Sequence, residues 1–147
     1  LSNAEIERLE TIVRHHMRPL LLGQGGALPT RRAIYRFYRD CGPAGVDICF
    51  LSLADFLATY GPSVHQDAWL HHLDVVRMLL EAWWESQAEV VSPPALLDGN
   101  LLMARFSLLP GPQIGRLLEA VREAQAAGQV SSLDEALSWV ESLLEKP

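Results

Sequence analysis

The sequence predicts an all-α fold, either one helical bundle or two small helical lobes. Along most of the chain, apolar residues recur at intervals of three and four, which is the period of one helix face, and the alternation typical of strands is nearly absent. Glycines and prolines gather between these periodic segments, where they mark the ends of helices. With 147 residues, 49% of them hydrophobic, the chain is long enough to bury a substantial core.

The first predicted helix spans 3–17. Ser2 and Glu5 fit a capping box at its start, in which each side chain satisfies a backbone N–H of the other residue. Pro19 is expected to end this helix, and a glycine-rich connection, "LLLGQGGALP", follows. The chain is therefore expected to leave the helical conformation before the next helix begins.

Three more helices are predicted before residue 92. Thr30 can cap a helix over 31–40, which stops at a Cys-Gly-Pro break. The next helix, 44–59, is hydrophobic on nearly all sides, and this predicts that it forms the buried centre of the bundle. A longer helix over 66–87 carries an apolar stripe that would face the same core.

A stiff Ser-Pro-Pro linker at 92–94 is the predicted boundary between two parts, 1–91 and 92–147. Asp98 can cap the first helix of the second part, and Pro112 suits the first turn of the next. A Ser-Glu capping box precedes the last. The three helices predicted here span 99–106, 112–127 and 133–144.

The net charge of −6 argues against a uniformly basic nucleic-acid binder, but the charges are unevenly distributed. Half of the twelve basic residues fall in one short stretch: Arg14, Arg18, Arg31, Arg32, Arg36 and Arg39. The last third is rich in glutamate. A local basic face can therefore meet phosphate while the rest of the surface stays acidic.

Cysteine use and hydropathy favour a cytoplasmic protein. Cys41 and Cys49 are eight residues apart and are interpreted as reduced thiols, with a local disulfide as the alternative. The most apolar segment is interrupted by Asp47 and Asp55, and no apolar run is expected to span a membrane. A basic segment followed by an apolar one, as in a secretory signal, is not found at the start.

The helix "RRAIYRFYRD" is the first candidate binding surface. Arg32, Arg36 and Arg39 share one side, and Tyr35 and Tyr38 lie close beside them. Guanidiniums bind phosphate through paired hydrogen bonds, and aromatic rings stack on unpaired bases, so this pattern suits RNA. The alternative is a solvated basic face whose aromatic side chains turn toward the core.

Histidine and aspartate positions raise the question of a metal. His15 and His16 are adjacent, and neighbours on a helix point about 100° apart, so the pair cannot easily grip one ion unaided. Asp55 lies in the middle of the most apolar helix, where a carboxylate is costly unless it is paired or binds an ion. It would either form an ion pair with an arginine of the basic helix or complete a metal site with His15 or His16.

Four segments together resemble the carboxy-terminal half of the bacterial tRNA nucleotidyltransferase and poly(A) polymerase family. They are "IVRHHMRPLLL", "TRRAIYRFYRDCGPAGVDICFLSLADFLAT", "PPALLDGNLLM" and "PGPQIGRLLEAVREAQAAGQVSSLDEAL". The resemblance implies a longer parent whose amino-terminal head transfers nucleotides from CTP or ATP to an RNA 3′ end with Mg²⁺. Because this chain lacks the Gly-Ser loop and paired aspartates of that head, it is expected to need no cofactor itself and to hold the RNA.

The resemblance also implies that the middle of the chain is part of an HD domain, the fold of metal-dependent phosphohydrolases. His15 and His16 fall where that fold supplies histidines, and Asp55 is similar to its last aspartate ligand. The defining upstream histidine and the His-Asp pair would precede Leu1. A functional HD site is therefore expected only in the parent, if at all.

The start of the helix over 112–127 resembles the part of the family that is associated with gripping RNA. Gly111 and Pro112 suit the cap and first position of that helix, so free N–H groups of 113–115 would point out of a positive helix end toward a phosphate. Gly115 would let a backbone approach, and Arg116 would close over the anion. The alternative is that Pro112 only starts the helix and Gly115 packs against a neighbour.

The sequence thus predicts the RNA-binding carboxy-terminal part of a nucleotidyltransferase that adds nucleotides to tRNA or RNA 3′ ends. Its expected partner is tRNA or another RNA 3′ end, with no membrane. Two alternatives stay open: a fragment of an HD-type phosphohydrolase, and a structural dimerisation module that would use the four tryptophans and an apolar stripe. A homodimer is compatible with each of these interpretations.

Overall fold

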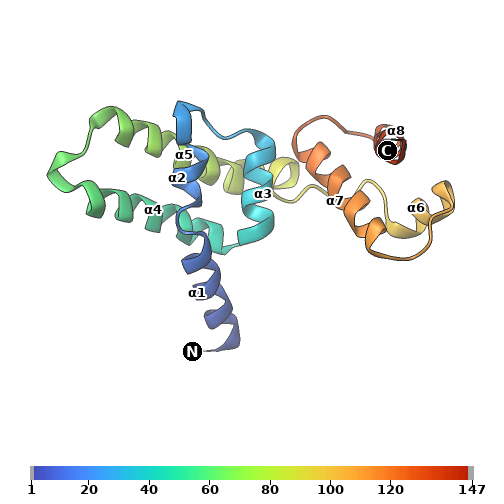
Figure 1. Ribbon diagram of the computed structural model, residues 1–147, viewed down its shortest axis with the longest axis horizontal. Coiled ribbons are helices and arrows are strands. Elements are labelled where there is room, and N and C mark those ends of the chain that lie inside the picture. Colours follow the sequence, from blue (N-terminus) through green and yellow to red (C-terminus); the bar gives the residue numbers. More distant parts are fainter. Residues whose placement is uncertain (1, 146–147) are drawn as a thin grey trace.

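The computed structural model describes residues 2–145, and this part of the chain is all-α, as predicted (Figure 1). No strand occurs among these residues. Short turns of 3₁₀ helix at Gln24–Gly26 and Gly61–Ser63 and a π-helical turn at Gln87–Val91 join longer helices. The α-helices of the described chain are α1 (Asn3–His15), α2 (Arg18–Leu22), α3 (Arg31–Cys41), α4 (Ala44–Tyr60), α5 (Gln66–Glu85), α6 (Gly99–Phe106), α7 (Pro112–Ala126) and α8 (Leu133–Leu144).

The capping signals predicted from the sequence place these helix starts correctly. The Glu5 N–H donates to Ser2 Oγ at 3.3 Å, and the Glu5 carboxylate accepts from the Ser2 N–H at 2.7 Å. Thr30 accepts from the Ala33 N–H, and Asp98 likewise caps α6. Each cap satisfies a backbone donor that the first helical turn leaves without a partner.

The prediction that Pro19 ends the first helix is wrong in detail. Helix α1 ends at His15, and Pro19 lies in the first turn of α2, where its side chain is buried. A proline is tolerated there because the N–H groups of a first turn have no acceptor within the helix. The short helix α2, which forms the first part of the segment predicted as a glycine-rich connection, packs against α4 and α5.

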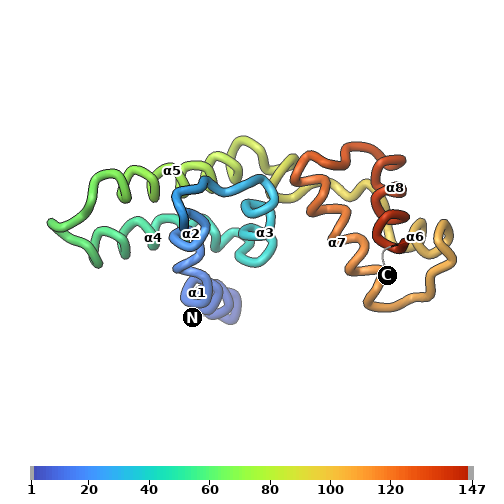
Figure 2. Tube along the Cα trace, turned by 45° about the horizontal axis from the view of Figure 1, so that its top comes forward, coloured from blue at the N-terminus to red at the C-terminus, as the bar shows by residue number. Residues whose placement is uncertain are grey.

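Residues before the linker form one core. Helices α4 and α5 lie side by side as a hairpin, with α3 across one end of it (Figures 1 and 2). The fully buried side chains of Phe37, Ile48 and Leu79 come from the three helices. Helix α4 approaches α3 closely at Gly45, where a Cβ atom would lie only 2.7 Å from a ring carbon of Tyr38.

Helix α4 is less buried than its composition predicts. Its inner side packs on α3 and α5, but Phe50 and Leu57 on the other side are 56% and 45% exposed. The expectation of a fully surrounded central helix is therefore wrong, since no described element covers this side. By length and hydropathy alone, residues 44–63 would suffice for a membrane span, but a core helix of a folded protein passes the same test. The expectation that no apolar run spans a membrane therefore stays a prediction.

Residues after the linker form a second, separate core. Helices α6, α7 and α8 surround the fully buried side chains of Leu102 and Val140, together with Val121. The Ser-Pro-Pro linker predicted at 92–94 runs between the two cores without helical structure. The predicted boundary at residue 92 therefore falls between two clusters of buried side chains, and the independence of the two parts stays a prediction.

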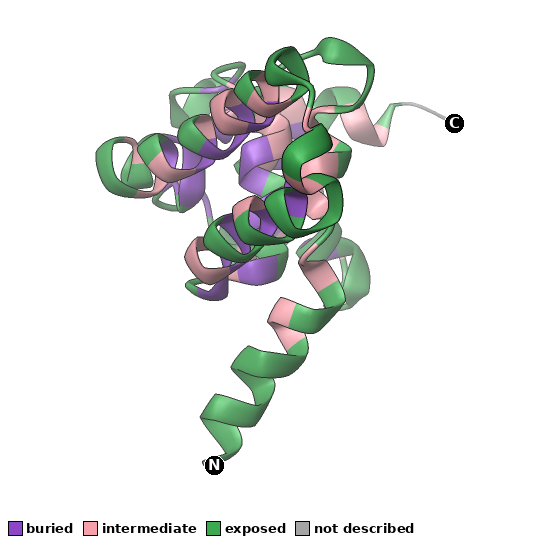
Figure 3. Ribbon diagram, turned by 90° about the vertical axis from the view of Figure 1, so that its left-hand side faces the viewer, coloured by how far each residue is buried: buried purple, intermediate pink, exposed green. Residues whose placement is uncertain are grey.

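Helix α1 extends away from the first core, and none of its residues is buried (Figure 3). An ion pair at 2.6 Å between Arg8 and Asp47 joins it to the start of α4. The apolar side chains of Ile6, Leu9 and Val13 share one exposed side. The helix is thus amphipathic, as its sequence pattern predicts, and apart from the Arg8 ion pair its partly buried residues lie in its last turns.

Candidate nucleic-acid interface

The two cores meet where α3 lies against α7. Arg36 donates to both carboxylate oxygens of Glu123, at 2.9 and 2.6 Å, and Arg39 donates to Glu119 at 3.1 Å. At the other end of the contact, Arg31 donates to the Ala126 carbonyl at 3.0 Å. Because residues 39, 36 and 31 meet residues 119, 123 and 126 in turn, the two helices run antiparallel. We call this contact the α3–α7 seam.

Arg32 completes the seam. Its Nε lies 3.3 Å from Glu123 but makes no hydrogen bond in that position, while its Nη2 donates to Gln129 at 2.5 Å. Hydrogen bonds from Arg36 hold the pKa of Glu123 below its usual range. Glu123 therefore accepts hydrogen bonds from Arg36 and also forms ion pairs with Arg32 and Arg39.

The predicted RNA-binding arginines thus have a structural role that the sequence interpretation did not include. Arg32, Arg36 and Arg39 do share one side of α3, but their charges are balanced by carboxylates of α7 and by Asp40. The Arg36 side chain is still 51% exposed. A part of each guanidinium can therefore face solvent or a phosphate, and an RNA contact by these arginines stays a prediction.

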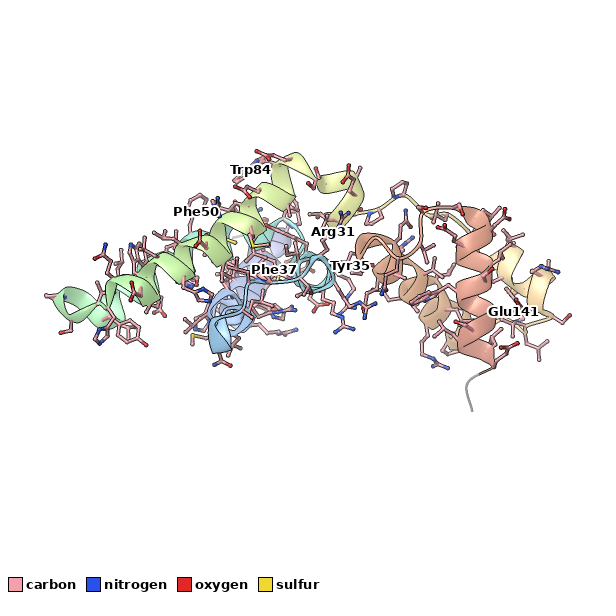
Figure 4. All side chains as sticks on the ribbon, turned by 90° about the horizontal axis from the view of Figure 1, so that it is seen from above. Arg31, Tyr35, Phe37, Phe50, Trp84 and Glu141 are labelled. Atoms are coloured by element: carbon pink, nitrogen blue, oxygen red, sulfur yellow. The ribbon has the colours of Figure 1, made fainter. Side chains whose placement is uncertain are left out.

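The tyrosines beside them do not offer rings for stacking. Tyr35 is 4% exposed, and its hydroxyl donates to Glu119 at 3.1 Å; burial, then the Glu119 charge, raises its pKa to about 12. Tyr38 is 3% exposed, and its hydroxyl donates to the Leu79 carbonyl. Figure 4 shows Tyr35 lying between α3 and α7. The expectation that Tyr35 stacks on a base is corrected: the aromatic side chains turn inward, as the alternative proposed.

The start of α7 keeps most of its predicted features. Gly111 is the cap in extended backbone, and Pro112 lies in the first turn. The Ile114 N–H, however, donates to the Gly111 carbonyl at 3.1 Å, so it is not one of the free donors expected there. A Cβ on Gly115 would meet no atom within 4 Å, so the alternative that Gly115 packs against a neighbour is wrong.

Arg116 follows at an exposed position. It takes part in none of the ion pairs found within residues 2–145. Helical periodicity places Arg116 and Glu123 on one flank of α7, and Gly115 and Arg122 on the other, with Glu119 between them facing α3. The amino end of α7 therefore presents an open backbone position and an unpaired guanidinium together.

The predicted metal ligands are only partly brought together. His16 and Asp55 line one small cavity of about 140 Å³, while His15 is half-buried, and burial together with Arg18 lowers its pKa. Asp55 is exposed and forms no ion pair with α3, so its expected burial is wrong. Within residues 2–145 no three His, Cys, Asp or Glu side chains form a group that could hold a metal ion. A metal role for these residues stays a prediction.

Both cysteines are buried free thiols, so the disulfide alternative is wrong. Burial raises the pKa of Cys41 to about 11 and that of Cys49 to about 12. The thiols are therefore neutral and unreactive at neutral pH.

Sequence reasoning missed the acceptors of the seam. Glu119 and Glu123 are spaced by four residues, the same spacing as Arg32 and Arg36, and this pattern could have suggested a pairing of the two helices. It also missed His72, a buried histidine whose Nε2 lies 2.9 Å from Ser52 Oγ. The signal that could have found it is helical spacing, because His72 lies three, four and seven residues before the buried Val75, Val76 and Leu79.

Comparison with known proteins supports the resemblance. Over 146 residues, 99% of this chain, it is 34% identical to the A-adding tRNA nucleotidyltransferase of Deinococcus radiodurans. Over 136 residues, 92% of the chain, it is 33% identical to the CC-adding tRNA nucleotidyltransferase of Thermus thermophilus. The matches span only 31% and 27% of the lengths of these relatives. No protein-family model and no solved structure matches the chain. The predicted similarity to bacterial tRNA nucleotidyltransferases is thereby confirmed.

Proposed function

We propose that this chain, which is similar to about a third of each of two bacterial tRNA nucleotidyltransferases, is the RNA-holding carboxy-terminal part of such an enzyme. The observation that carries the proposal is a similarity over 99% of the chain to a protein whose name states that it acts on tRNA. Nucleotide transfer, with Mg²⁺ and ATP or CTP, would belong to a separate head of the parent. This part would grip the tRNA in the cytoplasm and position its 3′ end.

The amino end of α7 is the proposed contact. Backbone N–H groups and the helix dipole make such an end favourable for a phosphate, and α7 is a 15-residue helix with the Gln113 N–H in its open first turn. The absence of a side chain at Gly115 leaves room for a sugar-phosphate backbone. Arg116, with no carboxylate partner among the described residues, would then neutralise the phosphate.

The half-exposed arginines of the α3–α7 seam extend this surface. Arg36 and Arg39 each already donate to a carboxylate of α7, so each would add an electrostatic attraction without leaving its partner. The expected binding is therefore sensitive to salt, as is usual where guanidiniums neutralise phosphates.

A gel-shift titration of tRNA with Arg116→Glu tests the proposal. We expect about a tenfold loss of affinity. The slope of the logarithm of the binding constant against the logarithm of the salt concentration should fall by about one. Gly115→Val should also weaken binding, because its side chain would occupy the space proposed for the RNA backbone. The fold should stay intact by circular dichroism, because the new side chain meets no other part of the chain. Arg77→Glu, on the exposed side of α5, is the matched charge reversal. Equal affinity of the Arg116→Glu and wild-type proteins would contradict the proposed contact.

A dimerisation role is a second candidate, because one side of the α4–α5 hairpin is apolar and exposed. Phe50 and Trp84 lie on this side and are 56% and 62% exposed (Figure 4). A cavity of about 310 Å³ lies between the helices there, lined by Leu53, Leu73 and Leu80 among others. Sedimentation with and without tRNA separates the two roles. Dimers that form with increasing protein concentration, and that do not change when tRNA is added, favour the dimerisation role.

A further inference from the structure

A second binding site is suggested by a cavity of about 430 Å³ between the two cores. It lies behind the α3–α7 seam, where α3, the end of α5, the linker and α7 come together. Its apolar lining includes Trp83, Val91 and Pro93, and its polar lining includes Arg39, Arg122 and Ser92. Roughly 300–1,000 Å³ is typical of sites that take a small organic ligand.

The charges of this cavity favour an anion. Two guanidiniums, Arg39 and Arg122, and one carboxylate, Glu119, line it. Glu119 accepts from Tyr35 at 3.1 Å and from Arg39 at 3.1 Å, so the charges of Glu119 and Arg39 offset each other and one positive charge remains in the lining. Arg122 is exposed and forms no ion pair within residues 2–145. It is therefore the guanidinium that is available for a ligand.

Two carboxylates hold the guanidinium of Arg39 in one orientation at the wall of the cavity. Its Nε donates to Asp40 at 2.8 Å, and its Nη1 donates to Glu119 at 3.1 Å. The hydrogen bonds that Arg39 donates to Asp40 and to Glu119 raise the pKa of Arg39, so the group is charged throughout the physiological range. A guanidinium that is oriented in advance loses less rotational freedom when it binds a phosphate.

The aromatic part of the lining suits a base. The ring of Tyr38 packs on the Trp83 indole with 5.1 Å between their centroids. This contact fixes the indole, whose remaining surface lines the cavity. Indole surfaces stack on bases of any kind. An apolar wall thus lies beside two guanidiniums, which matches a base next to its phosphate.

Access to the cavity is open along one flank of α7. Gly115 and Arg122 are seven residues apart and share this flank, and a Cβ atom on Gly115 would meet no atom of another part of the chain within 4 Å. A strand that passes over Gly115 can therefore reach Arg122 without meeting a side chain at that position. This joins the cavity to the surface proposed above for RNA.

We infer that this cavity binds one nucleotide unit, with its base against Trp83 and its 5′-phosphate between Arg39 and Arg122. The inference rests on the proposed function where the nucleotide belongs to an RNA strand. A free nucleotide has the same chemistry, so both sources are tested.

Amide and indole NMR spectra of the ¹⁵N-labelled chain provide the test, with AMP, adenosine, inorganic phosphate and a single-stranded adenylate trinucleotide as probes. AMP should shift the Trp83 indole signal, and adenosine or phosphate alone should bind at least several-fold more weakly. Arg122→Gln should weaken AMP binding about tenfold, and Arg77→Gln should leave it unchanged. Trp83→Leu should also weaken AMP binding. If the Trp83→Leu protein does not fold, Arg122→Gln still tests the inference, because Arg122 is exposed.

Tighter binding of the trinucleotide than of AMP identifies an RNA strand as the occupant, and equal or weaker binding identifies a free nucleotide. The inference is overturned if no probe shifts the Trp83 signal or if Arg122→Gln binds AMP as the wild type does. If tRNA binding depends on Arg116 while the cavity signals do not move, this inference fails alone. If the wild type binds no tRNA, the proposed function fails, and the AMP titration still decides the cavity.

Discussion

At the scale of single residues, Arg36 has the clearest structural task. Its paired hydrogen bonds to Glu123 join α3 to α7. Helix α3 belongs to the first core and α7 to the second, so this pair links the two cores. The side chain of Glu123 is 16% exposed, so the pair is less screened by solvent than a fully exposed one. Because Arg36 itself is half-exposed, the pair is expected to contribute only about 1 kcal/mol to the free energy of unfolding.

Arg36→Glu should lower the free energy of unfolding by about 1–2 kcal/mol, because it places a carboxylate beside Glu123 and Glu119. The exchange Arg36→Glu with Glu123→Arg should recover part of this loss, because Arg32 and Arg39 also lie beside position 123. Urea denaturation of the wild type, the two single variants and the double variant measures the coupling. If the loss of unfolding free energy in the double variant equals the sum of the losses in the two single variants, Arg36 and Glu123 are not coupled, and the ion pair does not stabilise the contact between α3 and α7.

At the scale of elements, α4 and α5 are joined through one buried histidine. His72 is 3% exposed, its Nε2 lies 2.9 Å from Ser52 Oγ, and its ring stacks on Phe56 with 4.9 Å between centroids. Burial, then the charge of His71, lowers the pKa of His72. The folded state thus holds this histidine neutral, and protonation favours the unfolded chain.

The pH dependence of stability follows from this shift. Below the ordinary pKa of 6.5 the unfolded chain binds a proton that the folded chain does not, so stability falls as the pH decreases. Between pH 7.5 and 5.5 the melting temperature of the wild type should fall by about 3 °C more than that of His72→Gln. Circular dichroism melts at both pH values measure this, and His65→Gln, at an exposed position, serves as the control. Identical decreases in the wild type and His72→Gln would show that His72 does not titrate in this way.

At the scale of the whole molecule, two cores meet through a largely polar contact between α3 and α7, and the turn at Gln87–Val91 also contacts α7. The buried side chains of the first core end at Val91, and those of the second begin at Leu97. Between them lie the linker and the α3–α7 seam, which consists largely of arginines and glutamates. Polar contacts of this kind couple two folding units weakly, so the two cores are expected to unfold with different stabilities.

Leu102→Ala tests this expectation. The side chain is fully buried, and its loss should cost about 3 kcal/mol. Amide hydrogen exchange should then accelerate in α6, α7 and α8, while amides of α5 near Leu79 keep their protection. Leu79→Ala should produce the reverse pattern. Equal acceleration in both cores would mean that the chain unfolds as one unit.

Much of this structure follows from local signals. The caps at Ser2, Thr30 and Asp98 place helix starts correctly because each depends on residues three positions apart. The burial of α4 and of Asp55 was predicted wrongly, because composition shows how apolar a helix is but not how many neighbours cover it. The role of the α3 arginines was incomplete for a related reason: their partners on α7 lie 80 or more residues away in the chain.

The sequence by itself determined the all-α class, the helix starts, the linker and the similarity to tRNA nucleotidyltransferases, because these depend on neighbouring residues and on their order. Only the tertiary structure decided that Tyr35 is buried, that Glu119 and Glu123 neutralise the arginines of α3, and that Gly115 faces open space. It also brought Trp83 and Arg122 to one cavity. These outcomes depend on which faces of distant helices meet, and this is settled by packing of the whole chain rather than by any local pattern.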